Sequence, residues 1–236
     1  MIQDDFVFFL PTRKGSERVK NKNTRTFANI EGGILAIKIQ QLLNVKRINK
    51  IIISTNDPLT IEIAESFKNS KIRIILRPDY LCLSSTVLDD FIKYIPTVID
   101  AHNIFWVHTT SPFANEQVYN LAIDTYIDKV LVKREYDSML SVTKIQNFLW
   151  SKREKQGVNF DRNVIKWPRT QDLEPLYEIN SAFFINSIES YFTYNDRIGK
   201  NPYLFELNKI QSFDIDWEDD FELAEYIYKS LNKVDE

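Results

Sequence analysis

The sequence predicts an α/β fold built on a mostly parallel, Rossmann-like sheet. Short apolar runs at residues 6–10, 51–55 and 104–108 are typical of strands that are buried on both faces. The segments between these runs repeat apolar residues at spacings of three and four, as amphipathic helices do. An alternation of strands and helices of this kind builds a parallel sheet that carries helices on both faces.

The expected elements follow in a regular order as far as residue 143. The expected strands are residues 6–10, 51–55, 73–77, 104–108 and 138–143. The expected helices lie near residues 35–43, 59–67, 86–101 and 116–132. A last helix is indicated by the apolar spacing of Phe221, Ala224, Tyr228 and Leu231. We expect one α/β domain over residues 1–236.

The alternation stops between residues 145 and 210, which we interpret as an insertion. A polar stretch at residues 152–157 with apolar flanks is typical of a hairpin. Aromatic residues are dense in the remainder of the segment. They form either a second small core or the surface of a homodimer, because aromatic side chains are enriched in interface cores.

Composition excludes several classes of protein. Hydrophobic residues make up 44% of the chain and the formal net charge is -3, so a packed core is expected and a surface for nucleic acid is not. The single cysteine, Cys82, excludes an internal disulfide and is expected to be a buried small hydrophobe. The N-terminal residues are acidic where a signal peptide is basic, and no apolar run approaches the roughly 20 residues of a membrane helix. These features predict a cytoplasmic protein without a membrane partner.

A basic loop follows the first expected strand at residues 11–23. Ligands of parallel sheets bind beyond the carboxyl ends of the strands, where this loop must lie. Gly15 and Ser16 allow a ligand to approach the backbone N–H groups closely. Positive charge for a triphosphate is available from Arg13, Lys14, Arg18, Lys20 and Lys22. The alternative is a solvated basic loop, since the chain has no Walker A pattern and no Gly-x-Gly-x-x-Gly.

Two aspartates, Asp214 and Asp216, stand two residues apart near the end of the chain. On a strand they point to the same side, and paired carboxylates beside nucleotide phosphates are a common way to hold Mg²⁺. The alternative is that Asp216 caps the last helix, with Asp219 three residues later as in a capping box. Capping leaves Asp214 without a role.

These features form part of a longer set of motifs that covers nearly the whole chain. The segment PTRKGSERVKNKN at residues 11–23 is similar to the pattern Pro-x-Arg-x-Gly-Ser-x-Arg-x-x-x-Lys-Asn that opens the acylneuraminate cytidylyltransferase family. Further segments match family motifs in order, at residues 53–57, 76–78, 110–113, 169–171, 180–182 and 212–225. The sequence therefore resembles this family, whose members make CMP-sialic acid and related compounds.

The resemblance implies a CTP-dependent nucleotidyltransferase that uses Mg²⁺, acts on a small 2-keto sugar acid and forms a homodimer by exchange of the insertion. It implies nucleotide-binding roles for Arg13, Gly15, Ser16, Lys22, Asn23 and Arg77. The expected catalytic set is Arg13, Lys22, Asp214 and Asp216, and the last two would carry the metal. The expected acceptor-binding set is His108, Ser111, Arg169, Gln171 and Asn180. Arg169 is the candidate cation for the carboxylate of the acceptor.

Three departures from the family pattern concern the substrate. His108 precedes the Thr-Thr-Ser-Pro segment where the family often has Gln, Lys20 replaces a common Pro, and Ser181 replaces a Gly. A histidine at a strand end is more often packed than catalytic, so a binding role is the most that His108 is assigned.

The expected reaction is in-line attack of an acceptor hydroxyl on the α-phosphorus, with pyrophosphate as the leaving group. A cytidylyltransferase for a different acid or a phosphorylated acceptor shares every motif. A metal-dependent glycosyltransferase also uses Asp-x-Asp, but that motif normally falls in mid-chain and the Arg-x-Gly-Ser loop is then missing. The third alternative is a nucleotide-sensing relative without activity.

Overall fold

The computed structural model describes residues 5–48 and 50–232. Part of the N-terminal segment on which the signal-peptide expectation rests, residues 1–4, lies outside the described residues. Seven strands form one central sheet in the order β3 (Ile72–Leu76), β2 (Ile51–Thr55), β1 (Phe6–Pro11), β4 (Asn103–Val107), β8 (Leu176–Ser187), β5 (Ser138–Ile145) and β9 (Pro202–Glu206). Only β8 runs antiparallel to its neighbours within this sheet. The predicted α/β fold with a mostly parallel sheet is confirmed.

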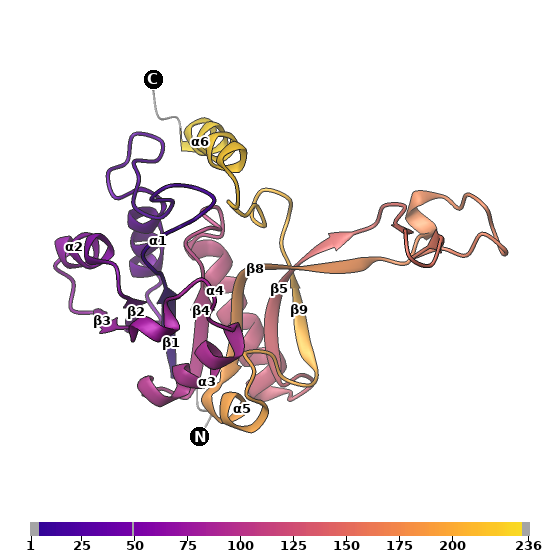
Figure 1. The fold of residues 1–236 in the computed structure, drawn as a ribbon. Coiled ribbons are helices and arrows are strands. Elements are labelled where there is room, and N and C mark those ends of the chain that lie inside the picture. Colours follow the sequence, from indigo (N-terminus) through magenta and orange to yellow (C-terminus); the bar gives the residue numbers. More distant parts are fainter. Residues whose placement is uncertain (1–4, 49, 233–236) are drawn as a thin grey trace.

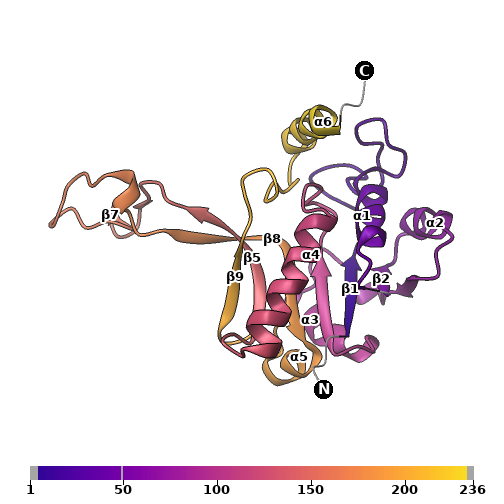
Figure 2. The ribbon, with the colours of Figure 1, turned by 180° about the vertical axis from the view of Figure 1, so that it is seen from behind.

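Helices cover both faces of the sheet (Figures 1 and 2). One face carries α1 (Gly33–Asn44) and α4 (Glu116–Tyr126), which continues as a π-helical turn over Ile127–Val132. The other face carries α3 (Leu88–Val98) and α5 (Ile188–Tyr194). Along β1, Phe8 faces the first layer and Phe9 the second, as the alternation of side chains on a strand requires. The continuous apolar runs of the sequence follow from this burial on both sides.

Three further elements complete the body of the protein. The helix α2 (Pro58–Ser66) follows β2, and the 3₁₀ turn η1 (Asp79–Leu81) follows β3. The last helix, α6 (Glu218–Asn232), packs Phe221 and Ala224 into a third core that also contains Phe27, Ile34 and Ile215. In the described part of the chain, no helix combines the length and the apolar character needed to span a membrane.

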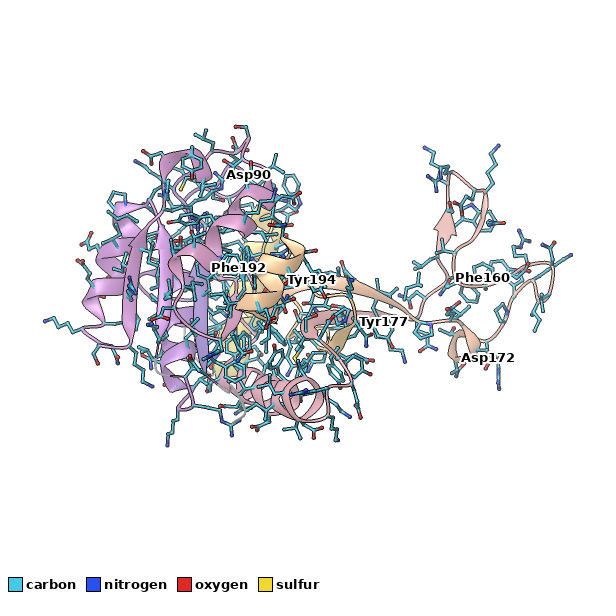
Figure 3. The ribbon with its side chains drawn as sticks, turned by 90° about the horizontal axis from the view of Figure 1, so that it is seen from below. Asp90, Phe160, Asp172, Tyr177, Phe192 and Tyr194 are labelled. Carbon is cyan, nitrogen blue, oxygen red and sulfur yellow. The ribbon has the colours of Figure 1, made fainter. Side chains whose placement is uncertain are left out.

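The segment expected to be an insertion is divided by the structure. Two of its parts, β8 and β9, are strands of the central sheet, and β8 lies between β4 and β5. The part between β5 and β8 leaves the body as an arm, residues 146–175 (Figures 1 and 3). The arm contains the predicted hairpin, formed by β6 (Trp150–Ser151) and β7 (Gln156–Gly157), and the 3₁₀ turn η3 (Thr170–Asp172).

The arm has little core of its own. Phe148 packs edge-on against Phe160 and Trp167, with ring centroids 5.2 and 5.4 Å apart. Trp167 is nevertheless 72% exposed and Val164 77% exposed. A single chain therefore leaves much of the apolar surface of the arm in contact with solvent.

Where β8 enters the body, its pairing with β5 is interrupted between Leu140 and Val142. Ser181 lies in the interruption with a left-handed φ of 59°. This backbone region is costly for residues other than glycine. It gives a physical reason for the glycine that the family pattern has at this position.

Candidate active site

A cavity of about 320 Å³ lies beyond the carboxyl ends of β1 and β2. Its lining includes five of the residues predicted to bind nucleotide: Arg13, Gly15, Ser16, Lys22 and Asn23. The loop turns at Gly15, whose φ of +82° favours glycine. The start of α2 closes the other side with Asp57, Pro58 and Leu59.

A larger cavity of about 760 Å³ lies between α1, α4 and α6. Carboxamides and apolar groups dominate it, and Glu116 is the one charged side chain among its described lining residues. It offers no cation for a phosphate chain. The smaller cavity is the candidate site because of its charge, not its size.

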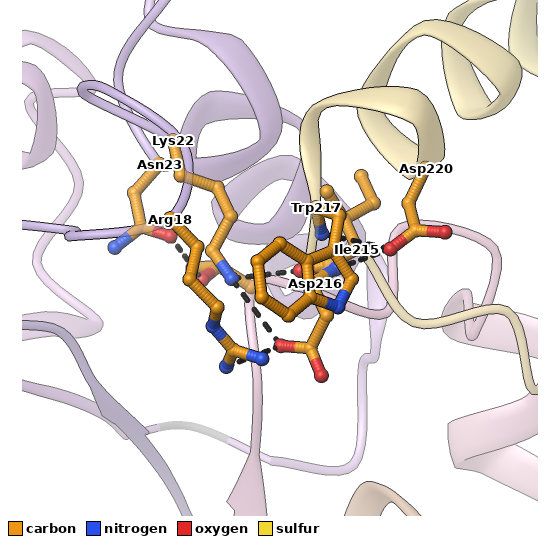
Figure 4. A network of polar contacts seen from close by, with 8 residues as sticks. Arg18, Lys22, Asn23, Ile215, Asp216, Trp217 and Asp220 are labelled. Carbon is orange, nitrogen blue, oxygen red and sulfur yellow. Dashed lines mark hydrogen bonds and ion pairs between the residues drawn. The ribbon is translucent and has the colours of Figure 1, made fainter.

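The segment that precedes α6 meets the basic loop at Lys22, which also lines this cavity (Figure 4). Lys22 Nζ donates a hydrogen bond of 2.7 Å to the carbonyl of Ile215 and lies 3.8 Å from Asp216 Oδ1. Arg18 pairs with the same Asp216 oxygen at 2.7 Å and stacks over the ring of Trp217. The opening and closing motifs of the sequence therefore form one site.

Residues 213–217 do not form a strand, contrary to the prediction. Ile215 N donates a hydrogen bond of 2.9 Å to the carbonyl of Thr110, which connects this segment to the turn after β4. Ile215 is fully buried in the third core, so the residues on either side, Asp214 and Asp216, turn away from it. Both aspartates act electrostatically on Lys22, so they lie near the same lysine of the basic loop.

The alternative that Asp216 caps α6 is wrong. Asp220 Oδ2 accepts hydrogen bonds from the backbone N–H groups of Asp216 and Trp217, at 3.0 and 2.8 Å. A carboxylate in the first turn of the helix thus reaches back to the N-terminal N–H groups. The Asp216 carboxylate is free of that role and faces the basic loop.

Electrostatics at the pair suit a cation. Burial raises the pKa of Asp214, the charge of Asp216 raises it further, and a hydrogen bond with Thr110 opposes the shift. Burial also lowers the pKa of Lys22, against the attraction of both aspartates. The described residues contain no group of three or more metal-ligating side chains. Two carboxylates that repel each other fit Mg²⁺ held jointly with substrate phosphates, because this ion keeps water and needs one or two protein carboxylates.

Arg77 and Asn23 make hydrogen bonds to other residues around the site. Arg77 donates 2.7 Å to the carbonyl of Ser54, stacks over Phe91, and has its pKa lowered to about 10 by burial. It is not among the residues that line the 320 Å³ cavity. Asn23 accepts a hydrogen bond of 2.8 Å from Thr109.

His108 is held as a neutral ring. Its Nε2 accepts a hydrogen bond of 3.0 Å from the indole N–H of Trp106, and its Nδ1 contacts the carbonyl of Ser181. A carbonyl only accepts, so Nδ1 carries the proton and both ring nitrogens are satisfied. Burial, with Arg197 nearby, lowers the pKa of His108 to about 4. The histidine therefore fixes the interrupted part of β8.

Two of the predicted acceptor ligands, Ser111 and Asn180, are buried in this fold. The Ser111 hydroxyl has no hydrogen-bond partner among the described residues. The Asn180 side-chain oxygen accepts hydrogen bonds from Ser141 Oγ at 2.7 Å and from the backbone N–H of Ala182 at 3.1 Å, and its nitrogen donates one of 3.1 Å to Thr143 Oγ1. Their assignment to acceptor binding stays a prediction.

Arg169 and Gln171 lie on the arm, away from the cavity (Figure 3, where Asp172 marks this turn). Arg169 is 80% exposed in its side chain and forms a two-pronged ion pair with Asp172, at 2.8 and 2.9 Å. Within one chain the structure does not bring these residues to the aspartate pair.

Sequence reasoning left two contributors out of the predicted site. Arg18 appeared as one of several basic loop residues, but its partner 198 positions later was invisible. Thr110 holds both the backbone and a carboxylate of the closing segment. The Thr-Thr-Ser-Pro segment at a strand end was the available signal.

Comparison with known proteins finds relatives that match nearly the whole chain. A family model described as "Cytidylyltransferase" matches residues 7–235. The N-acylneuraminate cytidylyltransferase of Escherichia coli is 28% identical over 232 residues, which cover 96% of this chain and 53% of that protein. A pseudaminic acid cytidylyltransferase of Campylobacter jejuni is 23% identical over 93% of this chain and 94% of its own length. The chain thus spans about half of the first relative and nearly all of the second.

Solved structures share the fold at low sequence identity. CMP:2-keto-3-deoxy-manno-octonic acid synthetase complexed with CTP superposes with a TM-score of 0.65 at 12% identity, covering 96% of this chain and 99% of that one. The 4-diphosphocytidyl-2C-methyl-D-erythritol synthase of Anaerococcus prevotii gives 0.67 at 13% identity, covering 97% and 98%. At these identities the likeness establishes the architecture.

Proposed function

The chain belongs to the cytidylyltransferase family, and on that premise we propose that it transfers the cytidylyl group of CTP to a sialic acid-like 2-keto sugar acid, giving the CMP-sugar and pyrophosphate. The observation that carries the proposal is the meeting of Lys22 with Ile215 and Asp216. It joins a basic phosphate-binding loop to a carboxylate pair at the carboxyl edge of a parallel sheet, where such folds bind nucleotides. The relatives named for sialic and pseudaminic acids supply the acceptor class.

In the proposed reaction the anomeric oxygen of the acceptor forms a bond to the α-phosphorus with release of its proton, and the bond between the α-phosphorus and the oxygen of the departing pyrophosphate breaks. Arg13 and Lys22 bind the triphosphate and meet the negative charge that grows on the departing pyrophosphate. Asp214 and Asp216 would hold Mg²⁺, which when bound supplies positive charge at the phosphate oxygens. Backbone N–H groups near Gly15 and Ser16 position the phosphate chain.

We also propose a homodimer in which the arm of one protomer packs on its partner. The exposed apolar side chains of the arm support this: Trp150, Val158, Val164, Ile165 and Trp167 are all at least half exposed in the single chain. In such a dimer, Arg169 and Gln171 on the arm of one protomer would reach the acceptor bound in the site of its partner. A cytoplasmic location accompanies the proposal, in keeping with the single cysteine.

A pyrophosphate-release assay tests the function. Four nucleoside triphosphates are crossed with N-acetylneuraminic, pseudaminic, N,N'-diacetyllegionaminic and 2-keto-3-deoxy-manno-octonic acids. We expect turnover with CTP and at least one of the nine-carbon acids, and loss of turnover in Asp216→Asn. Preference for another triphosphate would overturn the cytidylyl assignment. Release of a nucleoside diphosphate would instead indicate a glycosyltransferase.

A further inference from the structure

Lys38, on α1, is a completely buried lysine that the proposed chemistry does not use. Its Nζ lies 2.9 Å from the carbonyl of Ser111, 2.7 Å from the carbonyl of Ala114, and within hydrogen-bond distance of the Tyr119 hydroxyl. Its hydrogen-bond partners among the described residues include no carboxylate, and Glu116 is the acidic group whose charge acts on it. A lysine without a counter-ion in a protein interior requires an explanation.

The three oxygen partners can satisfy either an ammonium or an uncharged amine, and the two forms differ in what they leave for the proton of the Tyr119 hydroxyl. A neutral amine has two N–H donors and one lone pair, whereas an ammonium has three donors and no acceptor. The two carbonyls only accept, and the tyrosine hydroxyl can donate to the lone pair. With an ammonium, the tyrosine oxygen has to accept and its own proton needs another acceptor. The described residues show no such acceptor for Tyr119.

The carbonyls held by Lys38 belong to the turn that carries the active-site threonines. Gln41, also on α1, donates 2.7 Å to the carbonyl of Pro112 in the same turn. At the front of the turn, Thr109 bonds to Asn23 and Thr110 bonds to Asp214. The position of the turn on α1 therefore sets where these two threonines meet the candidate site.

We infer that Lys38 is held as an uncharged amine that fixes the turn of residues 109–114, and that through Thr110 it positions Asp214 for the reaction. Desolvation by burial agrees with this, since it lowers the pKa of Lys38 well below the ordinary value. The protonation state rests on the hydrogen-bond geometry alone, whereas the positioning role rests on the proposed function. The two parts can therefore be tested separately.

The protonation state is tested by lysine-selective ¹³C and ¹⁵N NMR at neutral pH. The signal that disappears in Lys38→Met identifies the residue. We expect it to have neutral-amine shifts and to couple to Tyr119, so that Tyr119→Phe moves it. An ammonium signal would overturn the inference, whatever the activity of the enzyme.

The positioning role is tested by kinetics on the full chain. Lys38→Met keeps the length of the side chain but releases both carbonyls, so we expect kcat to fall by about 10- to 100-fold. The Mg²⁺ concentration for half-maximal rate should rise, because Asp214 is displaced. Ile95→Ala, a buried change against the opposite face of the sheet, is the stability control. It should lower the melting temperature without changing the metal requirement.

If Lys38→Met and Ile95→Ala lose kcat and melting temperature to a similar extent, and neither changes the Mg²⁺ requirement, Lys38 is a packing residue and the positioning role is overturned. Lys38→Arg adds a further check, because guanidinium stays charged. It should be no better tolerated than Lys38→Met if the site requires a neutral group, and clear rescue by arginine would refute that requirement. If the wild type transfers no cytidylyl group to any acid, the proposed function fails while the NMR result stands.

Discussion

Replacing Lys22 by methionine separates the phosphate-binding role of this lysine from its role in the fold. The aliphatic stem remains, but Nζ and its hydrogen bond of 2.7 Å to the Ile215 carbonyl are lost. A buried carbonyl without its donor costs about 1–3 kcal/mol. A chain of this size loses roughly 2–4 °C of melting temperature for each kcal/mol. Lys22→Met should therefore melt measurably lower than the wild type.

The loss of rate should be far larger than the loss of stability implies. A preorganised donor to charge that develops in the transition state is worth about 10²–10³ in kcat. Single-turnover rates at saturating CTP measure this, with CTP affinity and thermal unfolding followed in parallel. Lys93→Met, which removes an exposed lysine on α3, is the control for charge alone. Lys22→Arg keeps the charge but puts a broad planar group into a buried site, so it should restore CTP affinity better than rate.

The result that refutes this reasoning is specific. If Lys22→Met melts lower but keeps a rate within about threefold of the wild type, the transition-state contact is absent. Lys22 would then be a bridge between the loop and the closing segment, and the phosphate-binding role would pass to Arg13 or Arg18.

Three further outcomes follow from particular contacts. Ser181→Gly should raise the free energy of unfolding by about 1 kcal/mol, because a left-handed φ of 59° strains a serine; denaturant titration measures this, and an unchanged midpoint would count against strain. His108 has a pKa lowered to about 4 in the fold, so its contribution to stability is lost as pH falls from about 6.5 toward 4. The difference in the free energy of unfolding between the wild type and His108→Gln should therefore change by roughly 2–3 kcal/mol across that range. A difference that stays constant with pH would contradict a buried neutral ring. Sedimentation should give twice the 27.9 kDa chain mass, Ile165→Asp on the arm should shift it toward monomer, and a monomeric wild type at micromolar concentration would remove the dimer proposal.

The parallel part of the sheet was predictable because its signal is local. A strand such as β2, buried on both faces, is apolar along its length whatever its neighbours are. The strand β8 gives no such signal. Its first half forms the exposed stem of the arm and its second half is core, with Ser181 between them. Its place between β4 and β5 depends on pairing partners far away in sequence, so it was assigned to an insertion.

The candidate site divides in the same way. The basic loop and the aspartate pair were predictable because their chemistry is visible in the residue types themselves. Residues whose role depends on a distant partner were not. Lys38 is an ionisable residue in an apolar helix pattern, and nothing in the sequence shows the two carbonyls that it contacts. The partners of the Asn180 amide were not visible either, because two of them, Ser141 and Thr143, lie on β5 and the third is the backbone N–H of Ala182.

The charged side chains at the site have partners without ligand and can exchange them for the charges of a bound ligand. Without ligand, Arg18 and Lys22 offset the charge of Asp216. In the proposed complex Lys22 would pair with the triphosphate, and Asp214 and Asp216 would hold the Mg²⁺ that accompanies it. The side chains of Arg18 and Asp216 are nearly half exposed, so their ion pair contributes little to stability and can be exchanged at small cost. The closing segment can therefore keep two acidic groups beside a basic loop in both states, held in place by Ile215 in the core beneath them.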